Sequence, residues 1–575
     1  MKAVLKRIGQ MMLTLVFAAV IFISRPGVGQ LVEGTLNGYV TDPNQAAVVG
    51  ASVTVTNQAT NFTRSSVTNS QGGFSFITLE PGTYTLVVKA PGFESYTKTG
   101  IVVNANEITR SDLALSVGQV SQNVTVSAQA SVLQVDRADV RSDLTAKTLS
   151  NLPIPLGRNY QQILAVVTPG IATPQSGQSF GANPGRAVAL TVNGISIGTN
   201  SYRVDGTSST NYNSVGNPMY TPALDAIETV NAVTNSYDAE QGIAGGISVN
   251  ITTKSGTNSI HGSLFEFHTD RAFQAYQWNA NGALPKPEYI NNQFGGTVGG
   301  PIKKDKLFYF VSYQGTYVNV GNALYAENPT AAMKTGNLSA SPTPIYDPST
   351  GDEKDCLPGG NAKLCGTGRT PFPGNIIPQS RIDPGIVALL AYAPWPNPNA
   401  PGTGSLGLSR NYLSTGVSSE TQNQFDTKLS WNQSSKLSMF ARFGLNDVSW
   451  LNPQQYGLLG GPGYSASNTA VGTGAGHIYS GTVSGTYIFG PTRIADAYYG
   501  YTRNDASAVP EELNKNLGWT LMGIPGLESS DPREGGLPSL QIDGFGVQDR
   551  IFLRLPSGLR TTSSRNTILM WRRSG

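Results

Sequence analysis

Apolar and polar side chains alternate with a period of two along much of the chain beyond residue 260. The segment 425–432 places Phe, Thr, Leu and Trp on one strand face and Asp, Lys, Ser and Asn on the other. After a short turn at 433–435, the segment 437–444 repeats the alternation. Because successive side chains of a β-strand point to opposite faces, this pattern predicts two-faced antiparallel strands. Further strands are expected at 262–269, 306–314, 480–489 and 493–502.

The connections between these predicted strands differ in length. Short turns occur at 432–435 and at Gly490-Pro491, whereas Gly-, Pro- and Asn-rich stretches occupy roughly 317–420 and 446–476. Outer-membrane barrels combine short periplasmic turns with long outer loops. A compact soluble domain rarely contains structureless connections longer than about 15 residues. The pattern therefore favours a membrane barrel over a half-buried soluble sheet.

Two regions with other residue patterns precede residue 260. Residues 31 to 117 contain short alternating runs, such as 51–56 and 82–89, between Gly, Pro and Asn turns. They predict an antiparallel β-sandwich of about seven strands. From 131 to 257 the pattern predicts both helices and strands, with short strands that end in tight turns. The predicted fold class is therefore mainly β, with an Ig-like or transthyretin-like sandwich, a small α+β domain and an antiparallel barrel.

The N-terminus has the pattern of an export signal. A positively charged start is followed by an apolar run over residues 11–23, shorter than the ~20 residues that span a bilayer. Gly27 and Gly29 occupy the positions of a signal-peptidase cut that leaves Gln30 as the first mature residue. An uncleaved anchor helix is the alternative. We expect export to the outer membrane with residues 1–29 as signal peptide.

Composition excludes some classes of function. Charged residues make up 13% of the 575 residues, against about 25% in an average soluble protein. The net charge of +3 is spread along the chain and forms no basic stripe of the kind that nucleic acid requires. The 66 glycines and 35 prolines fit many turns between short strands.

Candidate reactive residues are few. Cys356 and Cys365 lie in a Gly/Pro-rich segment without a nearby His, so a loop disulfide fits better than a metal site, with two free thiols as the alternative. The three histidines, at positions 261, 268 and 477, match no metal spacing or triad. His261 and His268 lie in a predicted strand region and are most simply strand residues. The carboxylates of Asp205, Asp225 and Glu228 have no fixed separation, and Asp-Gly is most often a turn. The Gly242–Gly246 run lacks the Lys-Ser/Thr of a phosphate loop. We predict no enzyme, metal or cofactor.

Three stretches of the N-terminal region carry a family resemblance. Gly38-Tyr-Val-Thr-Asp, Thr68-Asn-Ser-Gln-Gly-Gly-Phe-Ser-Phe and Leu79-Glu-Pro-Gly-Thr-Tyr-Thr-Leu resemble the carboxypeptidase-regulatory-like domain. The resemblance implies a sandwich over residues 30–117 and no peptidase activity. It leaves open a spacer or docking module and a carbohydrate-binding module.

The following segments resemble TonB-dependent receptors of the Oar-like family. Leu190-Thr-Val-Asn-Gly, Ser201-Tyr-Arg-Val-Asp-Gly and Ile247-Ser-Val-Asn-Ile-Thr-Thr-Lys-Ser-Gly-Thr-Asn are similar to the plug of these receptors. Asn292-Gln-Phe-Gly-Gly-Thr-Val-Gly-Gly-Pro-Ile is similar to the start of their barrel. The resemblance implies a plug over 131–257 and the first part of a barrel over 258–575.

A short segment before the plug-like region is similar to the TonB box, which a periplasmic partner pulls. It lies in the link 118–130 and consists of Val124, Thr125, Val126, Ser127 and Ala128. Its alternating β-branched residues suit strand addition to a partner's sheet. A plain linker strand is the alternative.

The resemblance implies an outer-membrane protein that works with the TonB–ExbB–ExbD complex and takes up bulky solutes of the oligosaccharide or peptide class. A surface adhesion or carbohydrate-binding protein without transport is the alternative. The predicted strands are fewer than the about twenty-two of such transporters. Unpaired backbone groups in hydrocarbon cost several kcal/mol each. We therefore expect the sequence to be part of a longer protein or an interrupted frame.

Overall fold

The computed structural model describes part of the chain, and the statements below concern that part. The described residues are 33–118, 123–127, 139–152, 158–172, 187–188, 190–195, 197–211, 217–237, 245–275, 286–351, 367–392, 396–404, 407–456, 472–490, 493–509, 516–523 and 563–573. The expected signal peptide, Ala128 and the two cysteines lie outside them. No helix in these ranges combines the length and apolar character needed to cross a membrane.

The N-terminal strands form two packed sheets. One sheet has the order β4-β1-β7, with β8 also paired to β1, and the other has the order β3-β2-β5-β6-β9. Leu36, Val53 and Leu86 are fully buried between the sheets, as their alternating patterns require. The predicted sandwich is confirmed. Its strands are β1 (Gly34–Thr41), β2 (Ser52–Asn57), β3 (Thr63–Val67), β4 (Gly73–Leu79), β5 (Gly82–Lys89), β6 (Ser95–Val103), β7 (Ile108–Arg110), β8 (Leu113–Ala114) and β9 (Asn123–Ser127).

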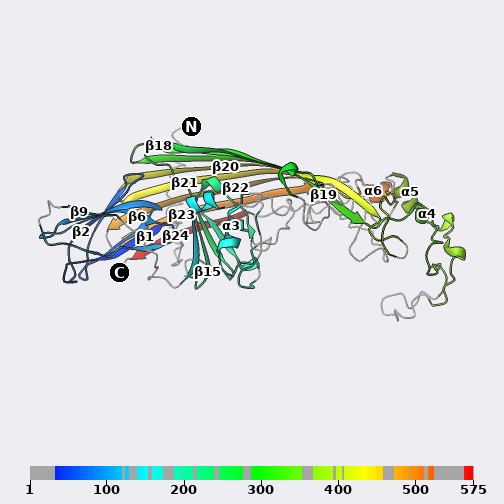
Figure 1. Ribbon diagram of the computed structural model, residues 1–575, viewed down its shortest axis with the longest axis horizontal. Helices are drawn as coiled ribbons and strands as arrows, with labels where there is room; N and C mark the ends of the chain where they lie inside the picture. The colour runs from blue at the N-terminus through cyan, green and yellow to red at the C-terminus, as the bar shows by residue number, and fades with distance from the viewer. Residues whose placement is uncertain are drawn as a thin grey trace, which may run out of the picture.

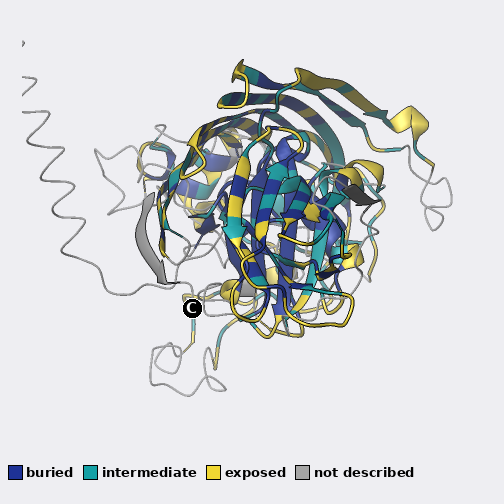
Figure 2. Cartoon of the chain, turned by 90° about the vertical axis from the view of Figure 1, so that its left-hand side faces the viewer, coloured by how far each residue is buried: buried dark blue, intermediate teal, exposed yellow. Residues whose placement is uncertain are grey.

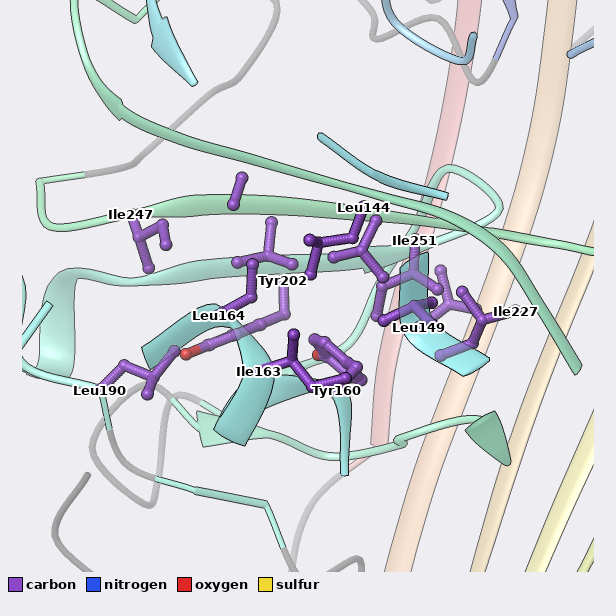
Figure 3. Packing of buried hydrophobic residues seen from close by; sticks show 14 of the residues in the cluster. Leu144, Leu149, Tyr160, Ile163, Leu164, Leu190, Tyr202, Ile227, Ile247 and Ile251 are labelled. Carbon is purple, nitrogen blue, oxygen red and sulfur yellow. The ribbon is translucent and has the colours of Figure 1, made fainter. Parts of the chain in front are cut away.

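Residues 139–253, named the central unit here, build a five-stranded sheet of order β10-β15-β16-β11-β12 with two helices. Helix α3 begins after Asn159, whose side chain accepts a hydrogen bond from the Gln161 backbone N–H at 2.9 Å. Figure 3 shows Tyr160 and Ile163 of α3 in the buried cluster with Ile251 of the sheet. The elements are β10 (Val140–Thr145), α2 (Ala146–Asn151), α3 (Tyr160–Val167), η1 (Ile197–Thr199), β11 (Ser201–Val204), β12 (Thr207–Ser208), β13 (Thr210–Asn211), β14 (Asn217–Pro218), η2 (Leu224–Ala226), β15 (Ile227–Asn235) and β16 (Ser248–Thr253).

Eight long strands form the third sheet, in chain order and each antiparallel to the next. The sheet is curved (Figure 2), but β17 and β24 are its two edges, so it is an incomplete barrel. The central unit lies against one face, and the sandwich lies at one end of the strands (Figure 1). The strands are β17 (His261–Asp270), β18 (Tyr289–Lys303), β19 (Leu307–Ala326), β20 (Tyr412–Ser434), β21 (Leu437–Asn452), β22 (Gly472–Gly490), β23 (Arg493–Val509) and β24 (Ser563–Arg573).

The alternation predicted for β20 is confirmed. Phe425, Leu429 and Trp431 are 37%, 45% and 44% exposed on the outer face, whereas Asp426 and Lys428 are buried on the inner face. An outward apolar row above a polar interior is the arrangement of a membrane barrel.

The predicted extent of the long connections was wrong. β19 continues to Ala326 and β20 begins at Tyr412, so the first connection is 327–411; the second is 453–471 instead of 446–476. The strands continue there through mixed polar and apolar residues, because pairing with a neighbouring strand satisfies the backbone whatever the side chains are. Strands β18 and β24 were not predicted. Short helices interrupt the connections, namely η4 (Arg271–Phe273), α4 (Ala331–Lys334), η6 (Pro373–Asn375), η7 (Gln379–Arg381), α5 (Pro384–Tyr392) and α6 (Leu517–Thr520).

Candidate functional site at the buried ionic interface

A tight hairpin of the central unit brings a carboxylate to the inner face of the long sheet. Val204 of β11 pairs with Thr207 of β12, which leaves Asp205-Gly206 as a two-residue turn. Both residues have positive φ, 45° at Asp205 and 83° at Gly206, as a type I′ turn requires. The prediction of an Asp-Gly turn is confirmed. The Asp205 side chain is nevertheless fully buried, because it faces the sheet and not the solvent.

Three hydrogen-bond donors and one further cation surround the Asp205 carboxylate. The Thr253 backbone N–H and hydroxyl donate to it at 3.1 and 2.5 Å. The Lys428 ammonium of β20 donates to it at 3.0 Å, and Arg442 Nε of β21 lies 3.7 Å away. Lys428 also donates to the Thr253 carbonyl at 3.1 Å and lies 4.7 Å from the centre of the Phe440 ring. The hairpin is thereby tied to two neighbouring strands.

A second carboxylate, Asp426 of β20, completes the interface. It accepts hydrogen bonds from the Arg442 guanidinium at 3.0 Å and from the Tyr220 hydroxyl at 2.7 Å. Arg442 also donates to the Ser480 hydroxyl at 2.9 Å, and its guanidinium lies 4.7 Å from the centre of the Tyr220 ring. Burial, and then the charge of Asp426, raise the pKa of Tyr220, so its hydroxyl remains a donor. We call Asp205, Tyr220, Asp426, Lys428 and Arg442 the ionic interface.

The ionic interface is balanced in charge, with two cations against two carboxylates. Its four charged side chains are at most 7% exposed. A buried pair contributes little net stability compared with apolar packing, but removal of one partner leaves an uncompensated charge. Such an interface fixes one position and can separate when water replaces the contacts, since polar groups regain hydrogen bonds that apolar groups cannot make. The arrangement positions the central unit against the long sheet.

Neutral contacts and two glycines surround the ionic interface. The Thr207 and Thr482 hydroxyls are 2.6 Å apart, and the Gln424 amide donates to the Thr221 carbonyl at 2.8 Å. A Cβ on Gly500 would lie 2.2 Å from Thr207 Oγ1, and one on Gly444 would lie 2.4 Å from Tyr220 Oη. Glycine is needed at both positions because the central unit approaches the strands so closely.

The sandwich contacts the end of the long sheet at which the β18–β19 turn lies. Asp305, in the β18–β19 turn, accepts hydrogen bonds from the Asn61 and Asn258 amides at 3.0 and 2.7 Å. The Thr486 hydroxyl donates to Glu33 at 3.4 Å. Burial and the nearby Asp496 raise the pKa of Glu33 well above its usual 4.5. The sandwich is therefore attached to the rim of the sheet.

A family comparison identifies the protein class. The model of the outer membrane beta barrel domain matches residues 252–566, which is more than half of the chain. The chain belongs to this outer-membrane barrel family. The carboxypeptidase regulatory-like domain matches residues 35–116, as the sequence predicted. Outer-membrane location of the barrel protein is thereby confirmed.

A curated relative of the barrel protein is a transporter. It is 25% identical to the TonB-dependent transporter Oar of Myxococcus xanthus over 352 residues, which cover 59% of this chain and 31% of that protein. The chain thus spans about a third of that curated relative. This match and the two domain matches confirm the predicted Oar-like resemblance.

Solved structures with partial similarity include two receptors. A mutant of the ferric enterobactin receptor of Pseudomonas aeruginosa has 14% identity and a TM-score of 0.35 over 65% of this chain and 42% of that one. A siderophore receptor of Acinetobacter baumannii has 16% identity and a TM-score of 0.30 over 64% and 48%.

The other residues singled out by sequence take separate positions in the barrel protein. Asp225 pairs with Arg158 at 2.9 Å, whereas Asp205 pairs with Lys428, so these carboxylates serve different contacts. His261 and His268 lie in β17, as predicted, and His477 lies in β22, 3.0 Å from Asp447. Within the described ranges, no three potential ligands gather as a metal site. The TonB-box-like residues from Val124 to Ser127 lie in β9.

Sequence reasoning missed the roles of Tyr220, Lys428 and Arg442. A signal existed, because Asp426, Lys428 and Arg442 are charged residues that alternate with the outward-facing apolar residues of their strands. Charges on the inner face of a barrel need partners, and the partner here comes from another domain.

Proposed function

We propose that the protein is an outer-membrane TonB-dependent transporter or receptor in which the central unit is the plug. The single observation that carries the proposal is the ionic interface. It holds the central unit against the barrel wall by contacts that can be broken and re-formed, which a movable plug requires. A structural filler of the barrel would be held better by apolar packing.

Energy for such movement has to come from outside the outer membrane, since open porins prevent an ion gradient across it. We propose that the TonB–ExbB–ExbD complex supplies it by pulling the segment 124–128. This segment precedes β10, the first strand of the central unit, in the chain. Tension on this segment would be transmitted to the ionic interface through β10 and β15, because these two strands are paired.

The inner face of the barrel is the part that we propose binds the solute, which is rich in hydrogen-bonding groups and of the oligosaccharide or peptide class. Beyond Asp426, toward the long connections, neighbouring strands present amides in register: Gln314 opposite Gln424, and Gln424 opposite Asn446. The Gln422 amide donates to Asn446 at 3.0 Å. Lys428 and Arg442 of the same face are paired with carboxylates, so they do not attract an anion.

The test uses cells that produce this protein and compares it with one altered form. Residues 122–130 are replaced by a Gly/Ser sequence of the same length, and uptake of fluorescent dextran oligosaccharides and of a labelled peptide digest is measured. We expect loss of uptake to the level seen with a protonophore, with outer-membrane residence unchanged. Uptake that persists after the replacement, or that ignores the protonophore, contradicts energy coupling. Cell attachment that ignores the protonophore would instead favour an adhesion protein.

A further inference from the structure

Strand β9 extends the sandwich by one strand. It runs parallel to β6, with Ser95 opposite Asn123, Thr97 opposite Thr125 and Thr99 opposite Ser127. The other edge of β6 is paired with β5. β9 therefore covers backbone groups of β6 that would otherwise form an open sheet edge, which is a ready template for pairing.

The sequence of β9 suits this position. Asn-Val-Thr-Val-Ser alternates β-branched residues and contains no charge and no proline, so nothing in it opposes strand pairing. The same residues resemble the TonB box, and a partner that encloses the segment or pairs with both of its edges needs the backbone N–H and C=O groups that β6 occupies. Docking on β6 and full capture by such a partner therefore compete for the β6-facing edge of this segment.

We propose that the sandwich is an intramolecular docking site for the segment 123–127, and that this segment must leave β6 before a partner can pull the central unit. The sandwich's ligand is then a strand of its own chain. The inference rests on the proposed function, since it assigns regulation to the segment that the energy-coupling complex would grasp.

The attachment of the sandwich explains why release comes first. Asn61 and Asn258 tie the sandwich and the chain beside it to Asp305 at the barrel rim. The Asn258 backbone N–H also donates to the Ala59 carbonyl at 2.9 Å. While β9 remains paired with β6, tension on it is borne by the sandwich and the rim. After release, the same tension reaches the central unit through the chain that follows.

The sandwich also contacts the first strand of the central unit. Arg141 of β10 donates to the Asn106 carbonyl, in the connection after β6, at 3.0 Å. It pairs with Asp139 at 2.7 Å, and the two side chains are 6% and 2% exposed. Both ends of the link between sandwich and central unit, β9 and β10, are therefore held by the sandwich. We call the pairing of the segment 123–127 with β6 the latch.

A reversible cross-link tests the latch in the full chain. Thr97→Cys with Thr125→Cys joins β6 to β9, and the matched control, Thr54→Cys with Ser65→Cys, joins β2 to β3, where the hydroxyls are 3.0 Å apart. Both native cysteines are replaced by serine. The probe is the purified periplasmic domain of TonB. We expect oxidation of the first pair to weaken its binding by about tenfold or more, because the segment is held intramolecularly. Reduction restores binding, and the control pair has no effect.

Hydrogen exchange gives an independent readout. In the reduced protein, binding of the TonB domain should accelerate exchange of the amides at 95–99, because β6 loses its neighbour. Equal binding by oxidised and reduced protein, with unchanged exchange at 95–99, overturns the latch and leaves the proposed function standing. Absence of TonB binding to the reduced protein overturns both. Failure of the 97–125 pair to cross-link where the 54–65 pair does so overturns the docking geometry.

Discussion

Substitution of Asp205 by asparagine is the most direct perturbation of the ionic interface. Asp205→Asn keeps the shape and a hydrogen-bond acceptor for Thr253, but it removes the charge that faces Lys428 at 3.0 Å. Asp426 remains engaged with Arg442 at 3.0 Å, so Lys428 becomes an uncompensated buried cation.

The size of the effect follows from what Lys428 retains. Breaking a buried pair by removing one partner costs about 3–5 kcal/mol. Lys428 still donates to the Thr253 carbonyl and faces the Phe440 ring, which favours the lower limit. We therefore expect a loss of about 3 kcal/mol, or roughly a hundredfold in the open population of the central unit.

Hydrogen exchange of β16 measures this population, because its amides exchange when the central unit opens. We expect the peptide 248–253 to exchange about a hundredfold faster in Asp205→Asn. Adding Lys428→Met removes the unpaired charge and should restore most of the protection. The control Asp505→Asn disrupts an exposed pair with Arg503 and should change nothing. The reasoning would be refuted if the peptide 248–253 exchanged at the wild-type rate in Asp205→Asn. It would also be refuted if adding Lys428→Met made that exchange still faster.

Three further predictions concern packing, the membrane face and pH. Gly444→Ala should lower the free energy of unfolding by about 1–3 kcal/mol, because its Cβ would meet Tyr220. Gly481→Ala should leave the free energy of unfolding unchanged, because the nearest atom to its Cβ would be 3.7 Å away. Chemical denaturation compares the two variants. Leu429→Arg places a cation on the outer face and should weaken insertion into lipid vesicles by up to about 2–4 kcal/mol; insertion equal to that of Leu429→Met would contradict a lipid-facing side. Docking of the sandwich raises the pKa of Glu33, so docking is strongest below its usual 4.5 and weakens as pH rises through the raised value. Spin-label distances between the sandwich and the 303–306 turn should show this weakening in the natural protein and not in Glu33→Gln.

The sequence alone was sufficient for the strand faces and for the sandwich. The alternation from Phe425 to Asn432 is a local property, because neighbouring side chains of a strand point to opposite sides whatever it pairs with. The Asp205-Gly206 turn was likewise predictable, since two positive φ angles favour these residue types. Periodicity could not give the strand ends, because β19 and β20 continue wherever the neighbouring strand satisfies the backbone.

Long-range partners were decided only in the tertiary structure. Asp205 and Lys428 are 223 positions apart, and no local pattern links a turn in one domain to a strand in another. The segment 123–127 has the composition of a pairing strand, but its parallel register on β6 depends on the sandwich leaving that edge free. Local sequence determines which groups need partners, and the packing of whole domains determines which partners come within reach.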